Sequence, residues 1–323
     1  MNTCPIPQPK HVNMVIYHKG CKDGYGAAFA AWLILGHGAI YIPVMHGDLP
    51  PGNYHGKHIV ICDFAFPRNI TLAMLENAAS MITLDHHDTS AVDLAGVPNC
   101  IFDNMRSGAV LAWNFFHNNI PVPRLLLHIQ DSDLWMFKLP ETKAILSQFD
   151  QMTWTFDEWL KYCNPSDPVG SERNLEIAAQ HGRPIIQFIQ SEIEKLAKRG
   201  TLRTLQGTPV VVLNTSQWID EVGHVMAKRF QNQAKFAMVW FYDHVKRSCK
   251  FSLRSVKNDV HMGRFAMQFG GGGHAQSAAF RWTRNVEELF DSEYYTNNNQ
   301  MYPLKYDYTL PTTKKKPLFI YKK

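Results

Sequence analysis

The sequence predicts an α/β protein with a mostly parallel sheet in a first domain, joined by a long helix to a smaller α/β domain. Three observations support this fold class. Strand-like apolar runs alternate with helical segments through the first half, which is typical of parallel sheets. A long amphipathic stretch at residues 171–199 then precedes a second series of strands. The length of 323 residues also suits two domains.

The first half contains five runs with the composition of buried strands. Asp23-Gly24 precedes an Ala-rich helical stretch, and Pro67 opens another helical segment. We expect strands at 12–18, 40–44, 58–63, 81–85 and 100–102, and helices at 25–35, 67–79, 107–117 and 124–129. These elements are assigned to a first domain, residues 1–170.

A helical linker is expected at residues 171–204. Ile185, Ile189 and Ile193 fall on one face, and Gly200 is placed to end the helix. The second domain, residues 205–290, is expected to contain strands at 209–213, 236–242, 250–255 and 278–282, and helices at 217–231 and 260–269.

The last segment, residues 291–323, is expected to be a polar, basic tail. It carries six lysines against three acidic residues, whereas the whole chain has a formal net charge of +5. The rest of the chain is therefore nearly neutral, and a uniformly basic surface for nucleic acid is not indicated. The composition of the tail is that of a linker, although its tyrosines could let it dock.

The chain shows no run of about 18 apolar residues and no signal-peptide pattern at its start. We therefore expect no membrane association and a cytoplasmic location. The six cysteines have no paired spacing, which indicates free thiols in a reducing compartment and argues against a zinc ribbon. Whether the protein forms a homodimer is left open.

Acidic and histidine residues follow the expected strands where these strands end. His18 and Asp23 follow the first, Asp63 follows the third, and residues 85–87 (Asp-His-His) follow the fourth. In open α/β sheets, ligands bind at the carboxyl ends of the strands. These side chains are therefore expected to gather at one edge of the sheet.

A fourth carboxylate, Asp131, follows a short helix in the run HIQDSDLW. Histidine and carboxylate ligands, without an obvious set of thiolates, suit ions such as Mn²⁺ or Mg²⁺. Two such ions about 3.5–4 Å apart can share a carboxylate and clamp a phosphate for in-line attack. The residues therefore point to a two-metal centre.

Each of these residues also has an ordinary structural interpretation. Asp23 could be the N-cap of the Ala-rich helix, and Asp63 could cap the helix that follows it. His86 and His87 could form a polar turn, and Cys62 is interpreted as a core residue. The order of the residues, more than any one of them, carries the functional hypothesis.

Five motifs occur in a fixed order: HKGCKDGYGAA at 18–28, ICDF at 61–64, LDHHD at 84–88, QDSDLW at 130–135 and FGGGGHAQSAAF at 269–280. LDHHD resembles the signature of the DHH phosphoesterase superfamily. The glycine-rich run resembles the GGGH motif of its DHHA1 subfamily. The resemblance covers nearly the whole chain before the tail.

The resemblance implies a DHH metal-binding catalytic domain, a DHHA1 substrate-binding domain and an active site in the cleft between them. Members include oligoribonucleases, RecJ-like single-strand exonucleases and dinucleotide phosphodiesterases. We therefore expect a metal-dependent phosphodiesterase, exonucleolytic on short single-stranded nucleic acid or acting on a (di)nucleotide. The alternatives are a 3′,5′-bisphosphate phosphatase and a non-catalytic nucleotide-binding protein with a decayed metal site.

The same resemblance assigns roles to the metal-binding residues. His18 would bind the first of two divalent ions, expected to be Mn²⁺ with Mg²⁺ as the alternative, and Asp23 the second. Asp63 would bridge the pair, while His86 and Asp131 would complete the second site.

Further residues are assigned to catalysis and to substrate binding. Asp85 and His87 fit positions beside the ligands or in proton transfer, so the catalytic set comprises Asp85, His86 and His87. Glycine lets the backbone approach a phosphate closely, and an arginine can make a charge-assisted contact with it. The expected substrate-binding residues are therefore Arg254, Gly271, Gly272, Gly273 and His274.

The chain departs from the family pattern in its first motif. Many members have D-x-D there, whereas this chain has Cys21-Lys22-Asp23. A Cys21 thiolate would be a softer metal ligand than a carboxylate and could favour a softer ion. Cys21 could equally be a spectator, so the number and identity of the ions stay open.

Overall fold

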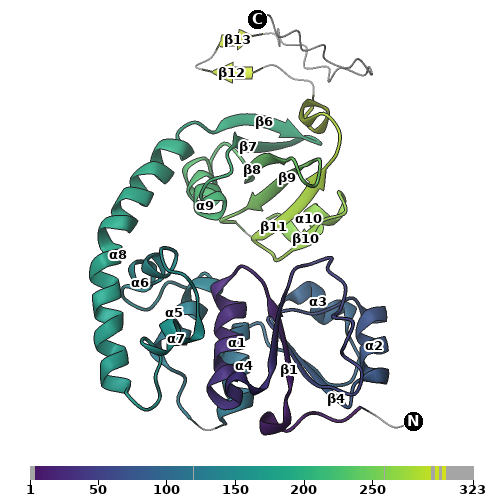
Figure 1. Cartoon of the computed structure of the whole chain (residues 1–323). Helices are drawn as coiled ribbons and strands as arrows, with labels where there is room; N and C mark the ends of the chain where they lie inside the picture. Colours follow the sequence, from purple (N-terminus) through teal and green to yellow (C-terminus); the bar gives the residue numbers. More distant parts are fainter. Residues whose placement is uncertain (1–3, 119, 258, 292–294, 298–299, 303–323) are drawn as a thin grey trace, which may run out of the picture. The chain divides into compact units, whose positions relative to one another are not determined.

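The computed structural model describes residues 4–118, 120–257, 259–291, 295–297 and 300–302 (Figure 1). These residues divide into two compact units. The first comprises residues 1–195 with 272–274, and the second comprises residues 196–271 with 275–323.

The first unit is built on a five-stranded, fully parallel sheet, which confirms the predicted fold class. The strand order is β2-β1-β3-β4-β5. This order reverses direction between β1 and β3. The strands are β1 (Met14–His18), β2 (Ile40–Val44), β3 (His58–Cys62), β4 (Ser80–Asp85) and β5 (Cys100–Phe102).

Helices cover both faces of this sheet, so its central strands are apolar on both sides. On β3, Val60 and Cys62 join one core with α1, α4, α5, α6 and α7, while Ile59 and Ile61 join a second core with α2. The helices are α1 (Lys22–Leu35), α2 (Arg68–Asn77), α3 (Asp88–Asp93), α4 (Gly108–His117), α5 (Arg124–Asp133), α6 (Thr142–Phe149) and α7 (Phe156–Leu160), with short 3₁₀ turns at Pro9–His11 and Gly36–Gly38.

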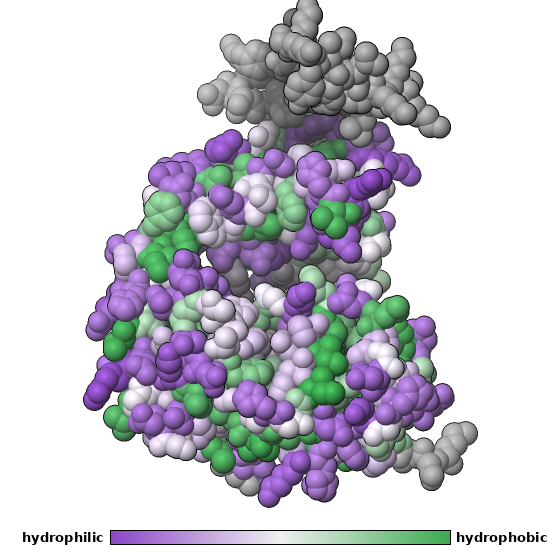
Figure 2. Space-filling view, viewed as in Figure 1, coloured by the Kyte–Doolittle hydropathy of each residue, from purple (hydrophilic) through white to green (hydrophobic). Residues whose placement is uncertain are grey.

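A long helix, α8 (Pro168–Ala197), follows α7. Ile193 is buried, and Ile185 and Ile189 are partly buried, so the predicted apolar face is the one that packs. The outer surface over α8, at the left edge of Figure 2, is mostly hydrophilic. The division between the two units falls at the end of this helix, between Lys195 and Leu196.

The second unit contains most of a mixed sheet of order β10-β11-β9-β8-β7-β6, whose edge strand β10 belongs to the segment 272–274 that is grouped with the first unit. Strands β7 and β8 are parallel, whereas β6 with β7, β8 with β9 and β9 with β11 are antiparallel. The elements are β6 (Thr201–Leu205), β7 (Thr208–Asn214), α9 (Ile219–Arg229), β8 (Phe236–Asp243), β9 (Ser248–Arg254), α10 (Met262–Met267), β10 (Gly272–Gly273), β11 (Ser277–Trp282) and a 3₁₀ turn at Val286–Leu289.

Two features differ from the predicted domain plan. Strand β6 occupies residues that the sequence assigned to the helical linker. Part of the predicted tail forms a short hairpin of β12 (Tyr295–Asn297) and β13 (Gln300–Tyr302). The lysines expected to make the tail basic lie outside the described residues. No described helix is both long and apolar enough to cross a bilayer.

The four-glycine run at residues 270–273 is divided between two structural roles. Gly270 has a φ of 73° and donates its N–H to Met267 O at 3.1 Å, and Gly271 donates to Ala266 O at 2.9 Å. This is the hydrogen-bond pattern of a Schellman motif, which ends α10. A Cβ at Gly271 would lie 2.1 Å from Ala279 O. The first two glycines therefore end the helix and let it pack on β11, and only Gly272–Gly273 form β10.

The close approach at Gly271 generates a stability prediction. Gly271→Ala should lower the free energy of unfolding by about 2 kcal/mol, because the added methyl group overlaps the backbone of β11. Gly52→Ala is the control, since nothing lies within 4 Å of the Cβ it would add. Urea unfolding followed by circular dichroism measures both variants. Equal midpoints for the two would contradict this packing role.

Candidate metal centre

The predicted acid and histidine residues meet at the carboxyl edge of the parallel sheet. His18 ends β1, Asp63 follows β3, and Asp85 ends β4. Parallel strands place these ends on one edge, and β1 and β3 flank the point where the strand order reverses. This topological switch point is where ligands bind in open α/β sheets.

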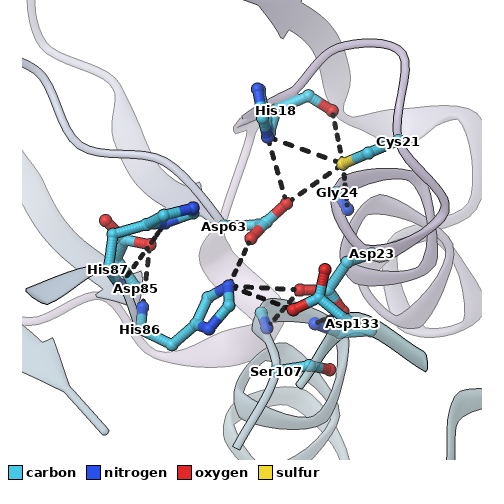
Figure 3. A network of polar contacts seen from close by, with 12 residues as sticks. His18, Cys21, Asp23, Gly24, Asp63, Asp85, His86, His87, Ser107 and Asp133 are labelled. Carbon is cyan, nitrogen blue, oxygen red and sulfur yellow. Dashed lines mark hydrogen bonds and ion pairs between the residues drawn. The ribbon is translucent and has the colours of Figure 1, made fainter. Parts of the chain in front are cut away.

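Asp63 stands at the centre of the cluster (Figure 3). Its Oδ2 atom lies 3.4 Å from His18 Nδ1 and 3.2 Å from Cys21 Sγ. Its Oδ1 atom lies 3.1 Å from His86 Nε2. The two oxygens of one buried carboxylate therefore face two different groups of potential ligands.

The backbone brings Asp63 close to the start of α4. Asp63 has a φ of 54°, which is uncommon for a residue other than glycine. A Cβ at Gly108 would lie 2.3 Å from the Cβ of Asp63. Only glycine at position 108 allows this approach, so the helix N-terminus and the central carboxylate fix each other's position.

Cys21 is the N-cap of α1. From the sequence, Asp23 was the candidate for this position. The Sγ atom of Cys21 accepts the N–H of Gly24 at 3.2 Å, and its S–H donates to Asp63 Oδ2. His18 Nδ1 lies 3.5 Å from the same sulfur. A Cβ at Gly24 would lie 2.2 Å from His18 O, so glycine allows α1 to start directly against the end of β1. His18, Cys21 and Asp63 together form one candidate ligand group.

A second candidate ligand group comprises Asp23, His86 and Asp133. His86 Nε2 lies 3.8 Å from Asp23 Oδ2 and 3.4 Å from Asp133 Oδ2. The Asp23 carboxylate also accepts the N–H groups of Gly108 at 2.6 Å and Ala109 at 2.9 Å. Asp23 thus caps the N-terminus of α4, where the helix dipole favours a negative charge.

Asp85 and His87 stand beside these two groups. Asp85 Oδ1 accepts the backbone N–H of His86 at 2.8 Å and lies 2.7 Å from His87 Nδ1. This contact orients the His87 ring, which leaves its Nε2 atom pointing away from Asp85. Asp85 also belongs to a third candidate group with Asp63, His86 and His87.

The electrostatics of the cluster show the crowding of its carboxylates. Burial acts to raise the pKa of Asp63, but hydrogen bonds from His18 and His86 outweigh it and hold that pKa below its usual value. Burial opposes protonation of His86, yet the hydrogen bond to Asp63 and the charge of Asp133 raise the His86 pKa to about 10. Burial and the charge of Asp63 raise the pKa of Asp133 to about 6.

The same causes act on the two groups on α1. Burial, Asp63 and Asp133 raise the pKa of Asp23 well above its usual value. Burial and the charge of Asp63 raise the pKa of the Cys21 thiol as well. Cys21 is therefore a neutral thiol when the cluster holds no cation.

The assignment of Asp131 to the cluster is corrected by the structure. Its side chain points away from the centre, is buried, and accepts the N–H of Lys138 at 2.7 Å, the N–H of Leu139 at 3.1 Å and the hydroxyl of Thr142 at 2.6 Å. Asp133, two residues later in the same motif, reaches His86 instead. Asp131 lies three residues after the buried His128 in α5, so the helical repeat places both side chains on the packed face of the helix.

His46 is a further residue near the centre that the sequence did not single out. It follows β2, and its ring centroid lies 5.3 Å from that of His18 and 6.2 Å from that of His87. Burial and the two neighbouring histidines lower the His46 pKa. Its place just beyond a strand end, the same feature that identified His18, could have identified His46 from the sequence.

None of the expected substrate-binding residues belongs to the candidate ligand groups, but His274 lies beside them, with its ring centroid 6.2 Å from that of His87 and its Nδ1 atom 3.0 Å from Asp88 Oδ2. Arg254 ends β9, donates to Leu253 O at 2.7 Å and forms an ion pair with Asp220. Gly272 and Gly273 form β10 at the edge of the second sheet, and His274 is exposed. The N–H of Gly271 is used to end α10, so the prediction that it binds phosphate is corrected.

The cluster has a donor set and electrostatics that suit divalent cations. Its described carboxylates pair with histidines, and the pKa values of Asp23 and Asp133 are raised by burial and by neighbouring negative charges. A bound cation would remove this repulsion. The oxygen and imidazole ligands suit Mn²⁺ or Mg²⁺, while the sulfur of Cys21 adds one soft ligand.

Comparison with known proteins gives matches in sequence and in fold. Residues 190–292 match the model of the DHHA1 domain. An uncharacterized protein of Acanthamoeba polyphaga mimivirus is 27% identical over 293 residues, which cover 84% of this chain and 68% of that protein.

Two solved structures share the fold at 12% sequence identity. One is the DHH domain of a protein described as a member of the s1p family of ribosomal proteins, with a TM-score of 0.56 over 87% of this chain and 85% of that chain. The other is an exopolyphosphatase-related protein from Bacteroides fragilis, with a TM-score of 0.51 over 87% of this chain and 89% of that chain. The chain therefore has the fold of the DHH phosphoesterase superfamily and carries a DHHA1 domain at residues 190–292.

Proposed function

We propose that this protein is a metal-dependent phosphodiesterase that hydrolyses short oligonucleotides or small nucleotide diesters, exonucleolytically where the substrate is a strand. The observation that carries the proposal is the convergence of two ligand groups on the two oxygens of Asp63. A carboxylate placed between two ligand groups is the arrangement that a two-metal phosphoesterase needs.

The two groups define which residues would hold the ions. His18, Cys21 and Asp63 would bind one ion, expected to be Mn²⁺. The other would be held by Asp23, His86 and Asp133, with Asp63 shared between them. When bound, the ions would neutralise the phosphate and activate the attacking water.

His87 is proposed as the residue that handles the proton. Burial acts against its protonation, but the hydrogen bond to Asp85 outweighs it and raises the His87 pKa. A protonated His87, oriented through Nδ1, can give a proton from Nε2 to the leaving oxygen. In the reaction, water attacks phosphorus, the P–O ester bond breaks, and the leaving group departs as an alcohol.

The six-stranded sheet and the segment that follows its edge strand β10 are proposed to hold the end of the substrate. Arg254 supplies a cation, and its Asp220 partner shows that this guanidinium already binds an anionic group. Gly272 and Gly273 offer backbone at a sheet edge, and the exposed His274 follows them. A terminal phosphate would compete with Asp220 for Arg254.

The alternative functions predict different results in one assay. Purified protein is incubated with Mn²⁺ and a panel of labelled oligonucleotides, linear and cyclic dinucleotides, and a nucleotide 3′,5′-bisphosphate. Cleavage of the diesters supports the proposal, and cleavage of the bisphosphate alone indicates a phosphatase. Binding without any cleavage indicates the non-catalytic protein with a decayed metal site.

Replacing the central carboxylate tests the metal centre. Asp63→Asn keeps the shape of the side chain but removes the charge that faces both ligand groups. Dinucleotide cleavage in Mn²⁺ should therefore fall by about a thousandfold or more, and calorimetry should show weaker Mn²⁺ binding. The exposed Asp157→Asn is the matched control. Near-normal turnover in folded Asp63→Asn would refute the assignment.

The correction at the end of α5 predicts opposite effects for two neighbouring aspartates. Asp133→Asn should weaken Mn²⁺ binding and slow hydrolysis. Asp131→Asn should instead lower the free energy of unfolding by about 2–4 kcal/mol, because the buried carboxylate accepts three hydrogen bonds. Calorimetry and urea unfolding on both variants separate the two roles, which would be reversed if Asp131 were the ligand.

The stability of metal-free protein provides a pH test of Asp133. Its pKa of about 6 lies above the value of about 3.9 expected in the unfolded chain, so the folded state binds this proton more tightly. The resulting penalty on the charged form develops as pH rises from about 4 to 6 and persists above it. Metal-free Asp133→Asn should therefore melt higher than wild type at pH 7.5 and equally at pH 4. Equal melting temperatures at pH 7.5 would contradict this.

Two substitutions of Cys21 separate a ligand from a helix cap. Both Cys21→Asp and Cys21→Ser keep an N-cap side chain for α1. If the sulfur is a ligand, both should abolish the thiolate-to-metal charge-transfer absorption of the Co²⁺-loaded protein. Cys21→Asp should preserve or raise activity with Mn²⁺, and Cys21→Ser should reduce it. The same metal dependence in all three proteins would assign Cys21 to capping alone.

A further inference from the structure

The loop between α5 and α6 has an unusual backbone. Trp135, Phe137 and Glu141 have φ values of 55°, 47° and 67°, although none of them is glycine. Bulky residues rarely adopt this conformation, and such residues gather at functional sites when the surrounding structure holds them there.

Asp131 holds this loop in place. Besides its three side-chain hydrogen bonds, its carbonyl oxygen accepts the N–H of Met136 at 2.9 Å and the N–H of Phe137 at 3.1 Å. Thr142 extends the network to the buried His128, whose Nδ1 lies 2.8 Å from the Thr142 hydroxyl. One buried aspartate therefore fixes the loop from its first turn to the start of α6.

The loop forms one wall of a cavity of about 410 Å³ in the first unit. The other wall is α8, which contributes Arg183, Ile186, Gln187 and Gln190. Helices α6 and α8 are in close contact beside it, since a Cβ at Gly182 would lie 1.8 Å from the carbonyl oxygen of Ala144. The cavity thus lies between two firmly packed helices and a fixed loop.

The chemistry of the lining combines aromatic surface with positive charge. Phe137 is the aromatic residue of the lining, and the ring of Trp135, which is 40% exposed and lies beside the cavity loop's Phe137 without lining the cavity, meets it edge to face with centroids 5.1 Å apart. Lys143 Nζ lies 4.4 Å from the centre of the Phe137 ring. Arg183 pairs with Glu141 at the same cavity. Aromatic faces beside cations are how proteins bind single-stranded nucleic acid without reading its sequence.

The cavity loop is joined directly to the candidate metal centre. Asp133 belongs to the second ligand group, and Phe137 follows it by four residues, so about 14 Å at most separates their Cα atoms. Asp131 precedes both residues in the sequence and fixes the loop, while Asp133 reaches His86. The separation is short enough for an oligonucleotide held at the metals to reach Phe137.

We propose that this cavity is a nucleobase site, in which Phe137, held by its contact with Trp135, stacks on a base of the substrate and Lys143 and Arg183 face its phosphate backbone. The proposal rests on the phosphodiesterase function and names the part of the substrate that the first unit recognises. It also explains why Asp131 is buried in a network of its own: Asp131 is a positioning residue for the base site. Ordinary surface packing would not require three strained residues in seven.

Nucleotide binding without metal tests this site apart from catalysis. The probes are a fluorescently labelled dinucleotide and its abasic analogue, which has the same sugar-phosphate backbone and label but no bases. Phe137→Leu and Trp135→Leu keep apolar side chains but remove the rings. Each should weaken dinucleotide binding about 5- to 150-fold without an equal loss for the abasic analogue. Phe188→Leu is the control, because this exposed ring on α8 does not line the cavity.

Each outcome separates the base site from the proposed function. Unchanged dinucleotide affinity in folded Phe137→Leu and Trp135→Leu, checked by thermal unfolding, overturns the base site, as does an equal loss for both probes. Wild-type cleavage of the dinucleotide in Mn²⁺ then still supports the phosphodiesterase. Conversely, base-dependent binding that the leucine variants lose, in a protein that cleaves nothing, supports the site and rejects the enzyme.

Discussion

The structure of the first unit depends on placing the Asp63 carboxylate, almost fully buried, among other acidic groups. Burial of a carboxylate is unfavourable unless hydrogen bonds or opposite charges compensate it. His18 and His86 provide that compensation, one on each oxygen. Asp23, equally buried, is stabilised by the first N–H groups of α4. Gly24 and Gly108 remove the side chains that would keep helices α1 and α4 away. The packing of both helices is therefore set by the cluster.

Topology explains why these residues meet. The parallel strands end at one edge, and the reversal between β1 and β3 keeps α1 and α4 on the same face, with their N-termini directed at Asp63. The C-terminus of α5 then closes the cluster through Asp133 and turns into the loop that Asp131 holds. The first residues of this loop thus connect the proposed metal ligand Asp133 with Phe137 of the proposed base site, which would make the loop geometry part of substrate selection.

The parallel strands and the position of the site at their ends could be predicted from the sequence. Buried parallel strands are short apolar runs, and polar residues mark where they end. His18, Asp23, Asp63 and His86 were placed by that rule, and the structure brings all four together. The role of Asp131 was predicted incorrectly, because the motif QDSDLW contains two aspartates. Only the direction of each side chain at the helix end distinguishes them. Capping by Cys21 and the division of the glycine run also depend on backbone hydrogen bonds, which composition does not reveal.

The cysteine at position 21 has a physical rationale that an aspartate would lack. Without cations, the centre already holds Asp23, Asp63 and Asp133, and a carboxylate at position 21 would add negative charge beside Asp63. A thiol with a raised pKa stays neutral, caps α1 and donates its hydrogen to Asp63. Binding of a cation reverses the balance, since it favours the thiolate. Cys21 thus stabilises the cluster in the absence of cations and, under the proposed function, would offer a ligand to a bound cation.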